Sequence, residues 1–514
     1  MSTAEQLAHR ADAGVDESSV EPLPGPPPVM PPTEPPSASE SGPGGAVRHA
    51  RPGVLCLLTA IVASLGVYVL TDLPREQVYM TGIFVLAALL WLTQSVPLFA
   101  TSIVIIGAMV IFLANPGGWV GFGFEEANAA NQPTYRQILA VGASPIIILF
   151  FGGFILAEAL VKQGVDKSMA AIIVRPFGGK PRATLAAVMG ATAFFSMWMS
   201  NTAATAMMIT LVGAMMMGVA QSEPFRRAMI LGVAFAANIG GMGTPIGTPP
   251  NAVALEALRQ RGITVRFGEW MLIAVPLAMG LLVVAWLMLI LIYKPESKDL
   301  ALRPEPQRIT GRGRFTLVIF GLTILLWLTG TWHGVPSYVV ALLPAVVFTS
   351  TGIIGRDDVN SLEWNILILI AGGLAIGLGM KLVGLDDTIA GAVSNFGITS
   401  SFLIVALLAG VTLLLSNFMS NTATANLVVP VGVTIMFALV GGEGESQMVV
   451  LAVSLALVAS IAMSLPVSTP PNAIAFSTDA ITVRQLATSG TVLSLLGLFL
   501  IIAFGGTIIA FWHG

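Results

Sequence analysis

The sequence predicts an all-α polytopic membrane protein with about 11 transmembrane helices and two re-entrant hairpins, arranged as two related halves. Three observations lead to this fold class: the apolar composition, the long apolar runs, and short motifs that recur in the same order. The chain has 514 residues, of which 55% are hydrophobic and 10% are charged. A soluble protein of this length needs far more charge on its surface, so the composition indicates that lipid is the solvent.

Residues 1–50 differ from the rest of the chain. The stretch from Pro22 to Pro43 is rich in Pro, Ser, Gly and Glu, with few apolar side chains to bury. We expect a disordered Pro-rich N-terminal tail here. It is not a signal peptide, because no charged start and short apolar core precede the apolar run that begins near Val54. A leading transmembrane helix is expected within 51–74.

The spans follow from apolar runs of about 20 residues, the length that crosses a bilayer as a helix. Two long runs, 228–258 and 447–478, are broken in the middle by Gly, Pro, Ser and Thr, and two others, 184–217 and 400–438, have polar clusters at their centres. A polar centre in a long apolar run favours a hairpin that enters and leaves by the same face. The uninterrupted runs are 54–72, 79–95, 97–114, 138–160, 271–293, 315–331, 335–354, 365–383 and 489–512.

Basic residues predict the orientation of these spans in the cell (inner) membrane. With a cytoplasmic N-terminus, the cytoplasmic loops hold most of the Lys and Arg, as the positive-inside rule requires. The few basic residues expected outside are Arg75, Arg136, Arg259, Arg261, Arg266 and Lys381. The formal charge of -3 gives no reason to expect nucleic acid as a partner.

Five short motifs occur twice in the same order: LLWLT, GG within an apolar run, SNTA, TPPNA and ITV. Their offsets are 236, 220, 220, 221 and 218 residues, which chance does not explain. If each half has an odd number of spans, the second inserts upside down, so 75–294 and 295–514 would form an inverted repeat. Each half would hold scaffold helices, one hairpin (inner in the first half, outer in the second) and one broken helix. The copies begin at Leu89 and Leu325, Gly152 and Gly372, Ser200 and Ser420, Thr248 and Thr469, and Ile263 and Ile481.

Interrupted helices at matching positions of inverted repeats are typical of secondary transporters, whose sites lie at the bilayer midplane. A channel can share this symmetry but has less need of two polar hairpins. An intramembrane enzyme is the other alternative, and the sequence argues against it. No HExxH motif occurs, and the core offers no Ser–His pair. The single cysteine, Cys56, excludes an intramolecular disulfide and a thiolate metal site.

The SNT motifs put two hydroxyls and a carboxamide at bilayer depth, where an unsatisfied polar group is costly. Their hydrogens can donate to a carboxylate, and their oxygens, with nearby carbonyls, can coordinate a hard cation. Ser196 and Ser416 lie four residues before Ser200 and Ser420, so an oxygen one turn away can join each site. The alternative is that these groups only form hydrogen bonds between helices. Their duplication beside a duplicated helix break favours binding.

The TPPN motifs explain the breaks, because two consecutive prolines remove two backbone donors and disfavour helix before them. Carbonyls around Gly247 and Ser468 are then free to face a cation. The helices that resume after the prolines point their positive ends toward the same centre, where an anion is favoured. No Arg or Lys falls at this centre, so neutral donors and co-bound cations would hold the anion. Glu158 and Lys381 are charges at membrane depth, with either a direct or a scaffold role.

At these residues the sequence resembles the divalent anion:sodium symporter (DASS) family, which includes sodium-coupled dicarboxylate and citrate carriers. The likeness runs from about Thr81 to Ile508 and includes both SNT motifs, both TPPN breaks and the WLT…VP stretch from Trp91 to Pro97. It implies a homodimer in which each protomer has a scaffold domain and a transport domain that moves by an elevator mechanism.

The resemblance also implies site residues, by position in the motifs. One sodium site would involve Ser196, Ser200, Asn201 and Gly247. The other would involve Ser416, Met419, Asn421 and Ser468, with Met419 and Ser468 acting through their carbonyls. The substrate would meet Asn201, Thr202, Thr248, Pro249, Asn421, Thr422, Thr469 and Pro470.

We therefore expect a transporter, with no enzymatic activity, that couples Na⁺ to uptake of a C4-dicarboxylate such as succinate, malate or fumarate. The alternatives are a dicarboxylate exchanger that sodium does not drive, and a sodium-coupled citrate or sulfate carrier of the same family.

Overall fold

The computed structural model describes residues 43–114, 133–296, 304–394, 400–441 and 444–513. Residues 1–50 form one unit and 51–514 the other, and the first unit is described only over 43–50. Residues 43–50 are the first part of helix α1, which runs from Pro43 to Leu70. The helix thus begins before the boundary expected at residue 51, and the rest of the expected tail lies outside the described residues.

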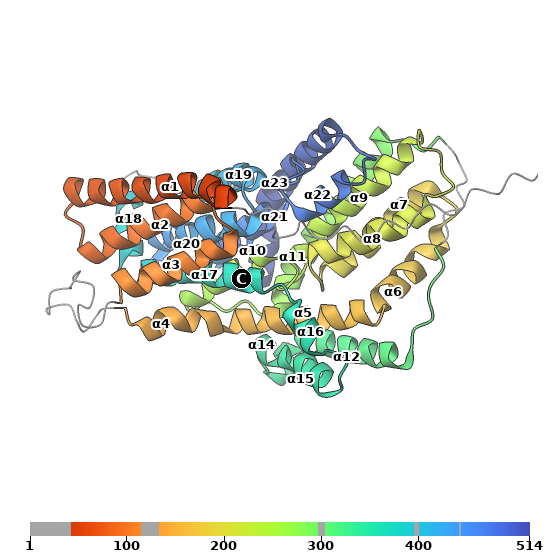
Figure 1. The fold of residues 1–514 in the computed structure, drawn as a ribbon, viewed down its shortest axis with the longest axis horizontal. Helices are drawn as coiled ribbons and strands as arrows, with labels where there is room; N and C mark the ends of the chain where they lie inside the picture. Colours follow the sequence, from red (N-terminus) through yellow and green to blue (C-terminus); the bar gives the residue numbers. More distant parts are fainter. Residues whose placement is uncertain (1–42, 115–132, 297–303, 395–399, 442–443, 514) are drawn as a thin grey trace, which may run out of the picture. The chain divides into compact units, whose positions relative to one another are not determined.

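The first half continues as a series of helices (Figure 1). Its broken elements match the predicted ones: the run 184–217 is the pair α7–α8, and the run 228–258 is the pair α9–α10. The helices are α2 (Arg75–Thr93), α3 (Leu98–Phe112), α4 (Tyr135–Leu139), η5 (Ala140–Ala143), α5 (Pro145–Lys162), α6 (Val165–Val174), η6 (Arg175–Phe177), α7 (Pro181–Ser196), α8 (Asn201–Met215), α9 (Pro224–Gly241), α10 (Pro249–Gln260) and α11 (Phe267–Ile292).

The second half repeats this order, with α19–α20 as the hairpin and α21–α22 as the broken helix. The expected span at 335–354 is divided at Ala341 into two short helices, α14 and α15, which differs from the single helix that its apolar run predicts. The helices are α12 (Gly311–Leu328), α13 (Gly330–His333), α14 (Ser337–Val340), α15 (Leu342–Ser350), α16 (Arg356–Asn360), α17 (Trp364–Leu382), α18 (Leu385–Ser394), α19 (Ser401–Phe418), α20 (Asn421–Val440), α21 (Glu445–Ser460), α22 (Pro470–Phe476) and α23 (Val483–His513).

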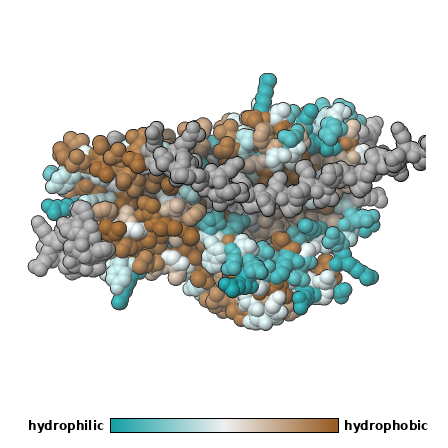
Figure 2. Space-filling model, in the orientation of Figure 1, coloured by the Kyte–Doolittle hydropathy of each residue, from teal (hydrophilic) through white to brown (hydrophobic). Residues whose placement is uncertain are grey.

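Helices suited to a bilayer make up much of the chain. Within the described ranges, nine helices are long and apolar enough to cross a membrane, and four shorter apolar helices add to them. Figure 2 shows hydrophobic residues over the area of α1–α3. On α1 the side chains of Val62 and Leu65 are 68% and 59% exposed, which suits lipid and not water. The chain is therefore a multi-pass integral membrane protein.

The two halves interlock at their broken helices. The helix after the first break, α10, packs against α20 and α21 of the second half. The helix after the second break, α22, packs against α8 and α9 of the first half. Each TPPN motif therefore begins a helix that packs on the SNT helix of the other half.

The duplicated tryptophans, Trp91 and Trp327, form the same kind of hydrogen bond in both halves. The indole of Trp91 donates to the carbonyl of Leu98 at 3.2 Å, and that of Trp327 donates to the carbonyl of Ser337 at 2.9 Å. Both acceptors follow a Val-Pro pair at the start of the next helix. The tryptophan thus ties the end of one helix to the start of the next.

Candidate functional site

The SNT motifs lie at the turns of the two hairpins. Ser200 and Ser420 are the N-cap residues of α8 and α20, and their hydroxyls accept from the backbone N–H of Ala203 at 3.3 Å and of Ala423 at 3.1 Å. A serine at this position satisfies one of the free N–H groups at a helix start. The local sequence thus ends the turn and begins the second helix at the same residue in both halves.

An oxygen cluster surrounds Asn201 at the first turn. The Ser196 hydroxyl lies 2.7 Å from Asn201 Oδ1 and donates to the carbonyl of Ala237 at 2.7 Å. The same Asn201 atom lies 3.2 Å from the carbonyl oxygen of Gly247 and 3.3 Å from that of Ala237. Oxygens this close repel one another unless a hydrogen or a cation lies among them. Turning the amide over would supply an N–H group, and a bound cation would supply positive charge.

A matching cluster surrounds Asn421 at the second turn. The Ser416 hydroxyl lies 2.9 Å from Asn421 Oδ1 and donates to the carbonyl of Ala459 at 2.8 Å. Ser416, Asn421 and Ala459 occupy the positions of Ser196, Asn201 and Ala237 in the first half. Both serines are fully buried. The repeat in the sequence is therefore also a repeat in side-chain geometry.

The loops at the two helix breaks are fixed by hydrogen bonds from Asn251 and Asn472. Neither residue was predicted to belong to the site. The side-chain amide of Asn251 donates to the carbonyls of Gly241, Met242 and Thr244 at 3.1, 3.4 and 2.8 Å. That of Asn472 donates to the carbonyls of Met463 and Leu465 at 2.9 and 3.0 Å. In both halves the acceptors include the residues nine and seven positions earlier. Both asparagines belong to the duplicated TPPN motifs, and this duplication was the signal in the sequence that could have identified them.

Glycines allow the first cluster to close. A Cβ atom at Gly241 would lie 2.4 Å from Asn201 Oδ1, and one at Gly247 would lie 2.4 Å from the carbonyl oxygen of Gly241. Neither contact is possible for a larger residue without movement. The loop, the end of α9 and the first hairpin turn meet here because glycine occupies both positions.

The predicted site residues differ in accessibility. The predicted cation ligands Gly247, Met419 and Ser468 are buried, as are Thr248, Thr422 and Thr469 among the substrate residues. The half-buried or exposed members are Ser200, Asn201, Thr202, Pro249, Asn421 and Pro470. Thr469 is the N-cap of α22, and its hydroxyl accepts from the backbone N–H of Asn472 at 3.3 Å. The hairpin turns thus offer the more accessible polar groups, and the breaks offer buried ones.

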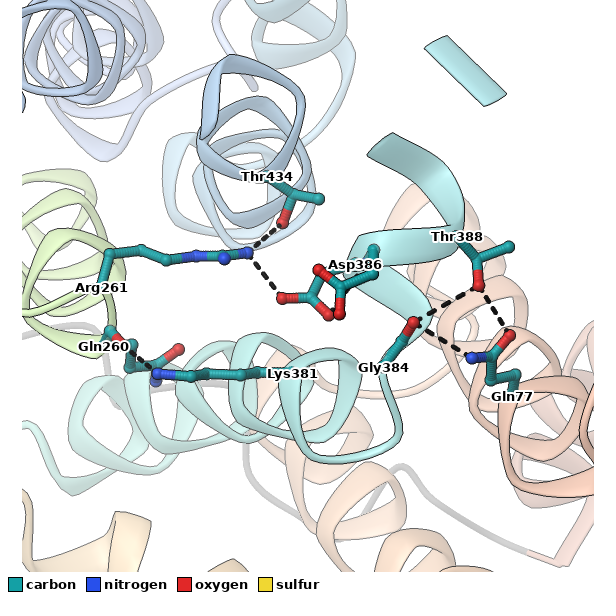
Figure 3. A network of polar contacts seen from close by, with 9 residues as sticks. Gln77, Gln260, Arg261, Lys381, Gly384, Asp386, Thr388 and Thr434 are labelled. Atoms are coloured by element: carbon teal, nitrogen blue, oxygen red, sulfur yellow. Dashed lines mark hydrogen bonds and ion pairs between the residues drawn. The ribbon is translucent and has the colours of Figure 1, made fainter. Parts of the chain in front are cut away.

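A polar network joins the end of α10 to the second half (Figure 3). Arg261 Nη2 lies 2.7 Å from Asp386 Oδ2 and donates to the Thr434 hydroxyl at 3.2 Å. The two charged side chains are 11% and 5% exposed. Lys381, one of the few basic residues expected outside, donates from its ammonium to the carbonyl of Gln260. This network buries the carboxylate at the start of α18 beside a cation from the other half.

The other charge predicted at membrane depth is Glu158, in α5. Glu158 is half-buried on α5, one turn before Lys162, whose Nζ lies 2.5 Å from Asp358 Oδ2. Hydrogen bonding from Lys162 and from the backbone N–H of Gly355 lowers the pKa of Asp358. Lys162 and Asp358 therefore join the end of α5 to α16 across the two halves.

A cavity of about 320 Å³ lies outside the two clusters. Its lining includes Leu149 of α5, Arg259 of α10, Phe267 of α11 and Trp327 of α12. None of the predicted substrate or cation residues lines it. Among the described residues, no group of three or more His, Cys, Asp or Glu side chains could hold a metal ion.

Buried helices with paired polar breaks define a membrane transporter. The chain belongs to the citrate transporter family CitMHS, whose model matches residues 88–437 and 331–512. Together with the relatives described next, this match confirms the resemblance to the divalent anion:sodium symporters. The family is described as one of citrate transporters.

Relatives with a described activity fall into more than one substrate class. The sodium-dependent dicarboxylate transporter SdcS of Staphylococcus aureus is 30% identical over 469 residues, which cover 84% of this chain and 86% of SdcS. An uncharacterized transporter of Haemophilus influenzae is 31% identical over 90% of this chain and 98% of its own length. The inorganic phosphate transporter PHO87 of Saccharomyces cerevisiae is 30% identical over 89% of this chain. The chain spans only 49% of PHO87, and 45% of a matching transporter from Schizosaccharomyces pombe.

Solved structures support the fold. The YdaH transporter of Alcanivorax borkumensis superposes with a TM-score of 0.53 at 16% identity, over 85% of this chain and 99% of YdaH. MtrF of Neisseria gonorrhoeae superposes with a TM-score of 0.50 at 11% identity, over 80% of this chain and 94% of MtrF. At these identities the likeness concerns the fold alone.

Proposed function

We propose that this protein is a secondary active transporter that couples sodium to the symport of C4-dicarboxylates such as succinate, malate and fumarate. The observation that carries the proposal is the pair of matching oxygen clusters around Asn201 and Asn421. The printed description of SdcS, a sodium-dependent dicarboxylate transporter, supports the same ion and substrate class.

The clusters suit sodium because their ligands are neutral oxygens. Backbone carbonyls at helix breaks and hydroxyl or amide oxygens are typical ligands of Na⁺ in transporters with interrupted helices. The first site would take Ser196, Ser200, Asn201 and the carbonyl of Gly247, and the Asn201 side chain lies 3.2 Å from that carbonyl oxygen. The second would take Ser416, Asn421 and the carbonyls of Met419 and Ser468.

The anion would lie between the two hairpin turns. Asn201, Thr202, Asn421 and Thr422 would donate to its carboxylates, with Thr248, Pro249, Thr469 and Pro470 at the breaks. The positive ends of α8, α10 and α20 favour the same charge. With no Lys or Arg among these residues, bound sodium supplies the countercharge, so anion affinity depends on the ion.

The proposal extends to assembly and movement. We place the protein in the cell (inner) membrane with a cytoplasmic N-terminus, as a homodimer whose transport domain moves by an elevator mechanism. The halves 75–294 and 295–514 would then form the inverted repeat. The matching element order and the exchange of α10 and α22 between halves support this arrangement.

Substrate choice and coupling have specific competitors. The family description names citrate, and PHO87 is described as an inorganic phosphate transporter. The alternatives are therefore a sodium-coupled citrate, sulfate or phosphate carrier, and a dicarboxylate exchanger that sodium does not drive.

Competition against labelled succinate in reconstituted vesicles separates these candidates. Malate and fumarate should compete at concentrations similar to that of succinate, whereas citrate, sulfate and phosphate should need far higher ones. Stronger competition by phosphate or citrate than by succinate would reject the dicarboxylate assignment and leave the family assignment unchanged.

A further inference from the structure

A buried side chain of the first half binds directly to the second break. The side-chain amide of Asn238, on α9, donates to Thr469 Oγ1 at 3.1 Å and to Asn472 Oδ1 at 3.3 Å. Asn238, Asn472 and Thr469 are 0%, 0% and 2% exposed. Hydrogen bonds between fully buried groups are strongly favoured, because a buried donor or acceptor without a partner loses its hydration and gains nothing in return. The end of α9 and the second TPPN motif therefore form one connected unit.

The same residue adjoins the first oxygen cluster through the backbone. The carbonyl of Ala237, the residue just before Asn238, accepts from Ser196 at 2.7 Å and lies 3.3 Å from the Asn201 side chain. An ion among these oxygens would attract that carbonyl and so change the peptide unit that leads to Asn238. One peptide bond thus separates the first cluster from the side chain that reaches the second half.

On the other side, Asn238 reaches the loop of the second candidate cation site. Asn472, its partner, donates to the carbonyls of Met463 and Leu465 and to Ser468 Oγ at 3.4 Å. Ser468 is one of the residues proposed for the second ion. The contacts from Asn201 through Ala237, Asn238 and Asn472 to this loop are continuous.

The repeat provides an internal comparison. The carbonyl of Ala459 accepts from Ser416 as that of Ala237 accepts from Ser196, so Ser460, the next residue, takes the place of Asn238 relative to the second cluster. Its hydroxyl donates to the carbonyl of Ala456 at 3.0 Å, within its own helix. The cross-half bridge of Asn238 therefore departs from the symmetry of the two clusters.

We propose that Asn238 is a positioning residue that couples the two cation sites, so that an ion at the first cluster orders the loop of the second. This inference rests on the proposed sodium coupling and adds to it an asymmetric link. With two coupled sites, the sodium dependence is sigmoidal, with a Hill coefficient between about 1 and 2. Without the link the sites fill independently, and because transport still needs both ions the curve stays only weakly sigmoidal, with a Hill coefficient of about 1.2.

The test compares sodium titrations of wild type, Asn238→Leu and Ser460→Ala. Leucine has nearly the shape of asparagine but no amide, so it removes the two cross-half hydrogen bonds while still filling the space. Two measurements are made on each purified full-length chain: sodium-dependent succinate uptake into vesicles, and the rise of Tm with sodium in detergent. The second measurement works even if a variant no longer transports.

We expect wild type and Ser460→Ala to give Hill coefficients close to about 2, and Asn238→Leu to fall to about 1.2 with a several-fold higher half-saturating sodium concentration. An Asn238→Leu curve as steep as that of wild type, or an equal loss of steepness in Ser460→Ala, would overturn the coupling role. A wild-type protein without any sodium response would instead reject the proposed function, and the inference with it.

Discussion

The hydroxyl oxygen of Ser196 lies 2.7 Å from the side-chain oxygen of Asn201, at the turn of the first hairpin. The repeat reproduces this pair at Ser416 and Asn421 with a separation of 2.9 Å. Each serine also donates to a carbonyl of the neighbouring broken helix. The two hairpins thus share the same local arrangement of side chains.

Removing the central amide of either cluster should abolish transport. We expect Asn201→Ala and Asn421→Ala each to lose sodium-dependent succinate uptake while remaining folded, because each variant loses an ion ligand and an anion donor. Thr210→Ala is the control, since Thr210 lies on the same α8 and donates only to the carbonyl of Ala206 at 2.9 Å. Wild-type uptake rates in both asparagine variants would refute the site assignment.

A methyl group at Gly241 should damage the first cluster selectively. Its Cβ would lie 2.4 Å from Asn201 Oδ1, whereas a Cβ at Gly213 on α8 meets nothing within 4 Å. We therefore expect Gly241→Ala to raise the half-saturating sodium concentration at least about tenfold, which corresponds to about 1.4 kcal/mol. Gly213→Ala should leave it unchanged. Equal sodium affinities in the two variants would contradict the close packing at Gly241.

The break loops should depend on the donor groups of Asn251 and Asn472. Replacing either residue with aspartate keeps its shape but puts a carboxylate against backbone carbonyls, so we expect Asn251→Asp to lower stability by about 1–3 kcal/mol and to stop uptake. The control is Asn417→Asp near the second hairpin turn, whose amide donates to one carbonyl, that of Leu413 at 2.8 Å, while its oxygen accepts from the backbone N–H of Ser464 at 3.1 Å, a bond that aspartate keeps. Thermal unfolding in detergent measures the difference, and a smaller loss in Asn251→Asp than in Asn417→Asp would count against the clamp.

The buried ion pair between α10 and α18 should be sensitive to loss of one partner. Asp386→Asn leaves Arg261 without a counterion, which costs about 3–5 kcal/mol in buried pairs. The double variant Arg261→Met with Asp386→Leu should recover most of this loss, because it removes both charges. The measurement is the unfolding temperature of each variant, which should be higher for the double variant than for Asp386→Asn. If the double variant is less stable than Asp386→Asn, the pair is a net source of stability.

Acid should weaken one link between the halves. Because Lys162 lowers the pKa of Asp358 in the folded protein, the stabilising effect of this carboxylate is present above the unfolded pKa of about 3.9 and is lost as the pH falls through the lower folded value. The pair is partly exposed, so the effect is at most about 1 kcal/mol. Tm should therefore fall less between pH 6 and pH 3 in Asp358→Asn than in wild type. Identical pH profiles would show that the pair adds no stability.

Much of the fold could be predicted because its signals are local and occur twice. The hairpins 184–217 and 400–438 and the breaks at the TPPN motifs appear where apolar runs contain polar or proline residues. The division of 335–354 at Ala341 was not predicted, since hydropathy shows that a segment is apolar and not where its helix is interrupted.

Partners of single side chains were harder to predict. No local pattern singles out Asp386, yet it is 4% exposed and paired with Arg261, which lies 125 residues away in the chain. The contact forms because α10 packs against helices of the second half. No local sequence pattern predicts that packing. The repeat held a partial signal, because Asp166 occupies the equivalent position and is 1% exposed.

Labelled succinate uptake into proteoliposomes, empty or preloaded with succinate, with and without an inward sodium gradient, tests sodium-coupled symport most directly. Our account predicts accumulation in empty vesicles that requires the gradient and that Asn201→Ala abolishes. Uptake only into preloaded vesicles, indifferent to sodium, would contradict it: the protein would be an exchanger, and the two oxygen clusters would be structural.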